Sequence, residues 1–195
     1  MDRKIFILFG LLISFQAVDI FFANDLTLEN FINFGEKIFP AFETVDFNGE
    51  IVTEKIFENK ISVLILWTTK DEKSCELLKK IAAEIKNLPE NVQIIGLVGD
   101  VRDNDTEIFQ NAKKISQKNF PAIRQLAVND NFYPVLSKIR TVPTTILVDE
   151  KGNLIGQPAG GGLEFILSEL NFILEKNSPR SQSLIKIQDF ILNKN

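Results

Sequence analysis

The sequence predicts an α/β fold in which helices flank a mixed central sheet, with a hairpin extension before the sheet and an extra helix at the C-terminus. Continuous apolar runs at 61–67, 91–98 and 144–149 have the length and composition of strands that are covered on both faces. Segments with apolar residues at helical spacing alternate with these runs. The four-residue turn at 150–153 makes the last two strands antiparallel, and the predicted sheet is therefore mixed.

The predicted elements follow in a regular order. Asn48-Gly49 is a two-residue turn signal, and it predicts a hairpin over 39–52. Three helices carry one apolar stripe each. Their stripes are Leu78, Ile81, Ala82, Ile85 and Leu88; Ile108, Ala112 and Ile115 within 106–118; and Leu163, Ile166, Leu167, Leu170 and Ile173 within 162–176. The shorter elements are helices over 25–39, 132–139 and 183–194 and strands over 122–128 and 154–157.

Composition excludes several function classes. The net charge of −4 argues against general nucleic-acid binding, which requires a basic face. The chain has no histidine, so a Ser-His-Asp triad and a histidine-containing zinc site are excluded. Its one cysteine can form neither an intrachain disulfide nor a cysteine-only metal site. We therefore expect no nucleic-acid partner, no metal and no cofactor.

The N-terminal residues resemble a targeting segment. Residues 5–15 are apolar and uncharged and follow Arg3 and Lys4, which fits the apolar region of a secretory signal and is short for a membrane span. Cleavage after Ala23 fits the small-residue pattern poorly, so the segment is either removed or kept as a membrane anchor. A buried N-terminal helix is the alternative. We expect an exported protein, periplasmic or otherwise extracytoplasmic.

Four segments follow from this organisation. They are a signal peptide or anchor at 1–23, an N-terminal extension at 24–38, the main domain at 39–176, and a C-terminal linker and helix at 177–195.

Three stretches carry a resemblance to a known family. They are FPAFETVDFNGEIV at 39–52, VLILWTT at 63–69 and TVPTTILVDEKGNLIG at 141–156. Together they resemble the thioredoxin-like superfamily, and more narrowly the TlpA-like and AhpC/TSA redoxin proteins, over 39–176. The resemblance implies a thioredoxin-like fold with a cis peptide bond between Val142 and Pro143. An ordinary turn or edge-strand proline is the alternative.

The chain departs from this family at the redox motif. The family's chemistry uses Trp-x-x-Cys-x-x-Cys, with the nucleophilic cysteine at a helix N-terminus. Counting from Trp67 puts Lys70 and Lys73 at the two cysteine positions, and a loop two residues longer puts Glu72 and Cys75 there. The nucleophile position lacks a cysteine on either count, so the site is degenerate and the dithiol mechanism does not carry over.

Cys75 has two interpretations. If Asp71 is the N-cap, Cys75 lies near the first turn of a helix, where the helix dipole and Lys70 and Lys73 would favour the thiolate. Its helical spacing from Leu78 instead places Cys75 on the buried apolar stripe of the helix. Burial there raises the pKa of a thiol and shields it from other molecules. Peroxiredoxins place their reactive cysteine eight residues after an aromatic residue, as Cys75 follows Trp67. In that register the chain lacks the Pro and the Thr of the peroxiredoxin motif, which argues against a peroxidatic role.

Two functions follow from the sequence. In the first, the protein binds a protein or peptide partner in a groove beside Val142, Pro143 and Thr144, next to the loop that contains Trp67 and Glu72. In the second, it is a single-cysteine thiol-disulfide oxidoreductase, or a peroxiredoxin-like protein, that acts through catalytic Cys75. The acidic residues Asp100, Asp103 and Asp105 are predicted to form a solvated loop rather than a cation site.

Overall fold

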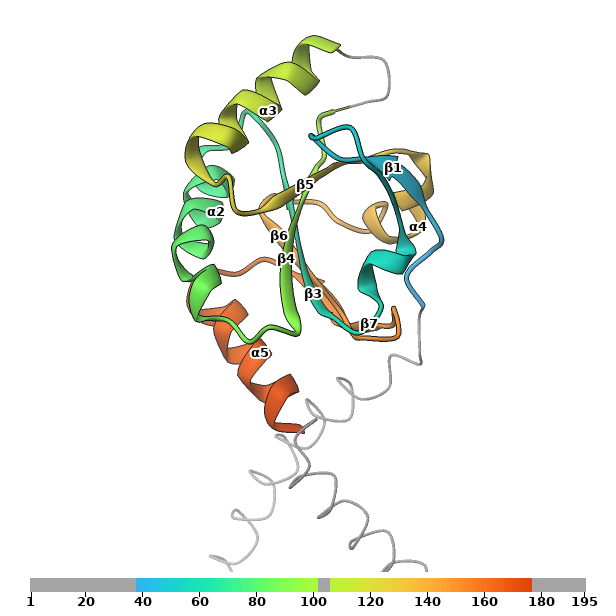
Figure 1. Cartoon of the computed structure of the whole chain (residues 1–195), viewed down its shortest axis with the longest axis vertical. Coiled ribbons are helices and arrows are strands. Elements are labelled where there is room, and N and C mark those ends of the chain that lie inside the picture. The colour runs from blue at the N-terminus through green and yellow to red at the C-terminus, as the bar shows by residue number, and fades with distance from the viewer. Residues whose placement is uncertain (1–37, 102–105, 177–195) are drawn as a thin grey trace, which may run out of the picture. The chain divides into compact units, whose positions relative to one another are not determined.

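The computed structural model describes residues 38–101 and 106–176, which form a five-stranded sheet, a separate two-stranded hairpin and the helices around them (Figure 1). The strands are β1 (Glu43–Val45), β2 (Ile51–Thr53), β3 (Ile61–Trp67), β4 (Val92–Val98), β5 (Arg124–Ala127), β6 (Thr144–Val148) and β7 (Leu154–Ala159). The α-helices are α2 (Glu72–Glu84), α3 (Thr106–Asn119), α4 (Tyr133–Leu136) and α5 (Leu163–Lys176). The 3₁₀ helices are η1 (Glu54–Phe57), η2 (Ile85–Asn87) and η3 (Asp130–Phe132).

The sheet is mixed, as the sequence predicts. Its strand order is β5-β4-β3-β6-β7, with β3, β4 and β5 parallel and with β6 antiparallel to both β3 and β7. All seven residues of β3 are buried, because helices cover one face of the sheet and the hairpin and short helices cover the other. Figure 1 shows α2, α3 and α5 on one side of the sheet, and the hairpin and α4 on the opposite side.

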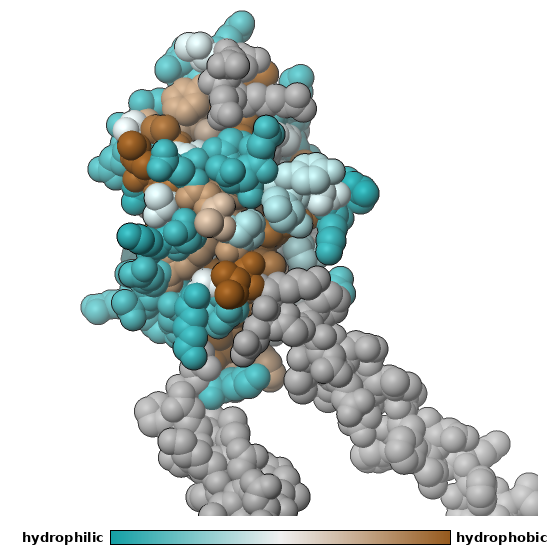
Figure 2. All heavy atoms as spheres, turned by 90° about the vertical axis from the view of Figure 1, so that its right-hand side faces the viewer, coloured by the Kyte–Doolittle hydropathy of each residue, from teal (hydrophilic) through white to brown (hydrophobic). Residues whose placement is uncertain are grey.

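A separate apolar core fills each side. The core beneath the three long helices contains the predicted inward residues Leu78, Ile81 and Ala112. The core beneath the hairpin is built around four phenylalanine rings that meet mostly edge to face, the geometry that aromatic pairs prefer. These rings belong to Phe39, Phe42, Phe57 and Phe132. Figure 2 looks onto the hairpin and α4 side, whose surface is mainly hydrophilic with scattered hydrophobic spots.

The hairpin connection is longer than the predicted two-residue turn. Val45 pairs with Ile51, so residues 46–50 join the strands. The carboxylate of Asp46 explains the difference, because it accepts hydrogen bonds from the backbone N–H groups of Asn48 and Glu50 at 2.8 and 2.9 Å. Such a side-chain turn competes with a tight two-residue turn.

Asp46 also fastens the hairpin to the sheet. Its side chain is buried, and Arg124 Nε donates to its Oδ2 at 2.8 Å. The Thr44 hydroxyl donates to the Ala127 carbonyl at 2.7 Å, and a bridge joins Asp46 to Leu126. These contacts cover the outer edge of β5, which would otherwise be an open sheet edge.

Several predictions fall partly or wholly outside the described residues. The helix at 183–194 and the apolar segment 5–15 lie outside them, and so does nearly all of the helix at 25–39. Within 38–101 and 106–176, no helix is both long and apolar enough to cross a membrane. The single helix predicted at 132–139 was wrong in detail, because η3 and the one-turn α4 stand there.

A buried hydrogen bond joins β3 to β5 across the intervening strand β4. Trp67 Nε1 donates to Gln125 Oε1 at 2.8 Å, and Gln125 Nε2 donates to the Ile123 carbonyl at 3.0 Å. The Gln125 amide lies over Gly96 so closely that a Cβ at position 96 would stand 2.0 Å from Gln125 Oε1. Glycine at position 96 is therefore what allows the amide to reach Trp67.

We predict that Gly96→Ala destabilises the protein by about 2 kcal/mol, because the added methyl displaces the buried Gln125 amide from both hydrogen bonds. Urea unfolding followed by the fluorescence of the single tryptophan measures this change. Gly99→Ala is the matched control, since its Cβ would stand 3.1 Å from a Leu66 methyl and 3.5 Å from the Trp67 carbonyl oxygen and would not meet the Gln125 amide. Equal destabilisation by the two variants would contradict the proposed role of Gln125.

Candidate functional site

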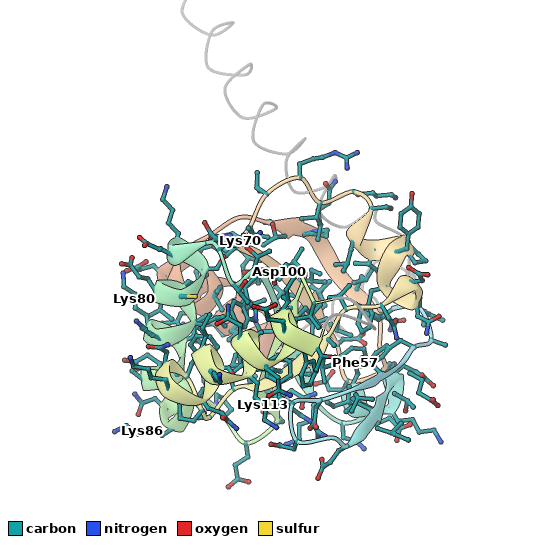
Figure 3. The ribbon with its side chains drawn as sticks, turned by 90° about the horizontal axis from the view of Figure 1, so that it is seen from above. Phe57, Lys70, Lys80, Lys86, Asp100 and Lys113 are labelled. Atoms are coloured by element: carbon teal, nitrogen blue, oxygen red, sulfur yellow. The ribbon has the colours of Figure 1, made fainter. Side chains whose placement is uncertain are left out.

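The loops that the sequence singles out meet at one end of the sheet. β3 and β4 are parallel and end together, and β6, antiparallel to β3, begins at that same end. The segments 68–71, 99–101 and 141–143 are consequently neighbours. Figure 3, seen from above, labels Lys70 and Asp100 near each other, and Thr69 in the first segment donates to Asp100 in the second.

Asp71 organises the first turn of α2. It is the N-cap with an extended backbone, and its carboxylate Oδ2 accepts from the Ser74 backbone N–H at 2.7 Å and also from the Ser74 hydroxyl. A carboxylate at this position satisfies free N–H groups and interacts favourably with the helix dipole. The N-cap predicted from the sequence is confirmed.

The pair of side chains that touch across this turn is Asp71 and Ser74. They are three residues apart, the spacing of the two cysteines in Cys-x-x-Cys, and Ser74 is completely buried. Counting from Trp67 did not find this pair, because it takes no account of where the helix begins. Lys70 and Lys73, one of the two pairs from counting, are both exposed.

Asp100 clamps the loop before α2 to the end of β4. Its Oδ2 accepts hydrogen bonds from the Thr69 backbone N–H at 2.9 Å and from the Thr69 hydroxyl at 2.6 Å. Its Oδ1 is buried and has no hydrogen-bond partner in the described part of the chain. The prediction of a solvated acidic loop is therefore wrong for Asp100, while Asp103 and Asp105 lie outside the described residues.

Cys75 is half-buried and packs against the core under the long helices. Burial is the main reason why the pKa of its thiol is raised above the ordinary value; the Lys79 ammonium opposes this shift, and the carboxylates of Asp71, Asp100 and Glu72 add to it. The cation that lowers the pKa is therefore Lys79, rather than the lysines that sequence reasoning named. The thiolate is disfavoured, which is the opposite of what an attacking cysteine requires.

The Val142–Pro143 peptide bond is cis in the structure. Thr144 is buried and its hydroxyl donates to the Thr141 carbonyl at 2.6 Å. Val142 and Pro143 are half-buried, and among the described residues nothing forms a hydrogen bond with the backbone N–H or C=O of Val142. Gly160 lies alongside, since a Cβ there would stand 3.8 Å from the Pro143 carbonyl oxygen.

The predicted site residues differ in how far a partner can reach them. Glu72 is exposed, and Val142 and Pro143 are partly exposed. Trp67 is completely buried, so it supports the loop from below and presents no surface to a partner. Thr144 is buried as well, and it pairs with Leu66 in the sheet. No cluster of three or more His, Cys, Asp or Glu side chains within 38–101 and 106–176 could hold a metal ion.

No protein-family model matches the chain, and no curated protein matches its sequence. Solved structures do match. The thioredoxin domain of a thiol-disulfide oxidoreductase from Bacteroides vulgatus is 22% identical, with a TM-score of 0.54 over 70% of this chain and 96% of that chain.

The chain has a thioredoxin-like fold. Two further structures agree. The pneumococcal exposed lipoprotein thioredoxin Etrx1 from Streptococcus pneumoniae strain TIGR4 is 16% identical, with a TM-score of 0.55 over 67% of this chain and 98% of that chain. A putative thiol:disulfide interchange protein DsbE from Chlorobium tepidum is 17% identical, with a TM-score of 0.54 over 72% of this chain and 95% of that chain. At these identities the likeness concerns the fold.

We predict that iodoacetamide alkylates Cys75 slowly, with a rate that rises only above about pH 8.5, since burial and neighbouring carboxylates raise the pKa of the thiol. Mass spectrometry of the folded protein over a pH series measures the rate. Lys79→Ala should slow labelling further at any given pH, because it removes the cation that lowers the thiol pKa. Fast labelling at neutral pH would contradict this description of the thiol.

We predict that the double substitution Asp71→Cys and Ser74→Cys, made with Cys75→Ala, forms an intrachain disulfide on mild oxidation, because these two side chains already touch. Thiol counting before and after reduction measures it. The control is Lys70→Cys with Lys73→Cys in the same background, which has the same spacing with both residues exposed. If the control pair oxidised as readily, the contact between positions 71 and 74 would not be what brings the two thiols together.

Proposed function

We propose that this protein is an exported thioredoxin-fold protein that binds an extended segment of a partner protein and does not carry out dithiol exchange. The binding surface comprises the backbone at Val142–Thr144 and the loop over 68–72. The observation that carries this proposal is the backbone of Val142, which has no hydrogen-bond partner among the described residues and lies at the end of the sheet where β3 leads into the loop before α2.

Free backbone groups are what a β-type partner needs. An extended peptide can pair its own N–H and C=O groups with those of Val142, and such pairing provides affinity without a thiol. Gly160 adjoins Pro143, so a segment in this position meets no side chain from residue 160. The half-buried side chain of Val142 packs against the core and holds the backbone in place.

The first turn of α2 supports binding rather than redox chemistry. Disulfide exchange needs a thiolate and a resolving thiol. Asp71 and Ser74 take the two positions with that spacing, and neither can form a disulfide. The chain's single cysteine has a raised pKa at the next position of the helix.

The proposal of export rests on the sequence. Residues 5–15 have the character of a secretory apolar segment, which is either cleaved or kept as an anchor. One of the similar folds belongs to an exposed lipoprotein.

The second candidate is a single-cysteine oxidoreductase. Two observations favour this candidate: the Cys75 side chain is partly exposed, and the Lys79 ammonium acts to lower the pKa of its thiol. A peroxiredoxin-like variant would need an arginine at the thiol. Arg140 is exposed and donates to the Ser137 carbonyl at 2.9 Å, so its guanidinium is engaged within its own segment.

We predict that a photo-crosslinking amino acid at Thr141 captures a defined partner in cells, because this exposed residue adjoins the free backbone of Val142. Mass spectrometry identifies the adduct. The control carries the same amino acid at Phe172, which is 61% exposed on α5. A binding surface gives an adduct from position 141 that position 172 does not give.

Cys75→Ser separates the two candidates. If binding is the function, the adduct from position 141 survives this substitution, because no covalent step contributes to it. Loss of the adduct in Cys75→Ser would favour the oxidoreductase, and no specific adduct from position 141 would remove the support for the binding proposal.

A further inference from the structure

The buried oxygen of Asp100 lacks a partner. The two salt bridges of the described residues are both made by Arg124, so Asp100 has no cation partner there either. Taking a carboxylate oxygen out of water without a donor or a cation is costly in free energy. An unsatisfied buried group of this kind in a folded protein requires an explanation.

Thr69 does not provide that explanation. Its two hydrogen bonds both go to Oδ2, and they would form equally well with the oxygen of an asparagine. Lys70 follows in the same loop and is exposed (Figure 3), yet the structure contains no ion pair between Lys70 and Asp100. The negative charge at position 100 therefore serves no described contact within the chain.

The position of Asp100 points to the partner surface. It clamps the loop over 68–71, and its carboxylate lies near enough to Cys75 to act on the thiol together with Asp71 and Glu72. Its segment is also at the end of the sheet where β6 and the Val142 backbone begin. A segment bound at Val142 would pass close to this carboxylate.

We propose that Asp100 determines specificity at this surface by accepting a hydrogen bond from a lysine or arginine side chain of the bound segment. The inference rests on the proposed function. A cationic side chain supplies both the donor and the charge that Asp100 lacks, and the bound segment excludes water and so strengthens the attraction. Because Oδ1 is buried in the free protein, the donor would have to displace the atoms that cover it.

Two peptides test the proposal on the full ¹⁵N-labelled chain. Both are capped, extended heptapeptides of alternating Val and Thr; one has arginine at its centre and its twin has citrulline, which has nearly the same shape without the charge. We expect the arginine peptide to bind about tenfold more tightly and to shift the amide signals of Thr69 and Val142. Asp100→Asn should remove this preference. Glu164→Gln, which changes the charge equally at an exposed residue, should preserve it.

The stability of Asp100→Asn provides a readout that requires no ligand. The asparagine oxygen can still accept both Thr69 hydrogen bonds, while the uncompensated charge is gone. We therefore expect the thermal midpoint to rise by about 2–4 °C. A purely structural aspartate would give a lower midpoint and an unchanged peptide preference, and this pair of results would overturn the proposal.

The outcomes also separate this inference from the proposed function. Equal binding of both peptides at Val142 would leave partner binding in place and overturn the role of Asp100. If neither peptide shifts the Val142 signal at millimolar concentration, both proposals fail. A preference that survives in Asp100→Asn assigns the charge recognition to another carboxylate and overturns the inference.

Discussion

The hydrogen bond between Trp67 and Gln125 is the constraint on which the candidate site depends. Trp67 is the last residue of β3, and the loop that leads to α2 starts immediately after it. The bond fixes the indole under this loop, and Gly96 makes room for the amide that accepts it. The donor is buried, so an indole without this acceptor would leave an unpaired N–H group in the core, at a cost of about 1–3 kcal/mol. This hydrogen bond therefore fixes the end of β3, and through the short connecting loop it also fixes where α2 begins.

In the first turn of α2, a carboxylate and a hydroxyl make contact at the spacing that the two cysteines of a Cys-x-x-Cys motif have. The Asp71 carboxylate accepts hydrogen bonds from the backbone N–H and from the hydroxyl of the buried Ser74. An N-cap of this kind contributes about 1 kcal/mol of stability and, unlike a disulfide, forms without oxidation. Burial is the main cause of the raised pKa of Cys75, and the Asp71 carboxylate that caps the helix adds to it.

Asp100 is the opposite case, because one of its oxygens is buried at a cost that the described contacts do not offset. Binding surfaces often retain groups that are poorly satisfied until a ligand arrives, and the free protein is then less stable than its fold allows. The partly exposed backbone of Val142, at the same end of the sheet, also has no hydrogen-bond partner among the described residues. The rest of the domain, with its two filled cores, provides the rigidity that keeps both groups in place.

By itself the sequence determined the strands, the long helices, the mixed sheet and the N-cap at Asp71, because these follow from local periodicity and from turn residues. It also predicted the cis bond before Pro143, through a resemblance over adjacent residues. Only the tertiary structure decided that Trp67 is buried, that Asp71 touches Ser74 and that Asp100 holds Thr69. The physical reason is the range of the contacts: Thr69 and Asp100 are 31 residues apart and Trp67 and Gln125 are 58 apart, so no local pattern in the sequence records them.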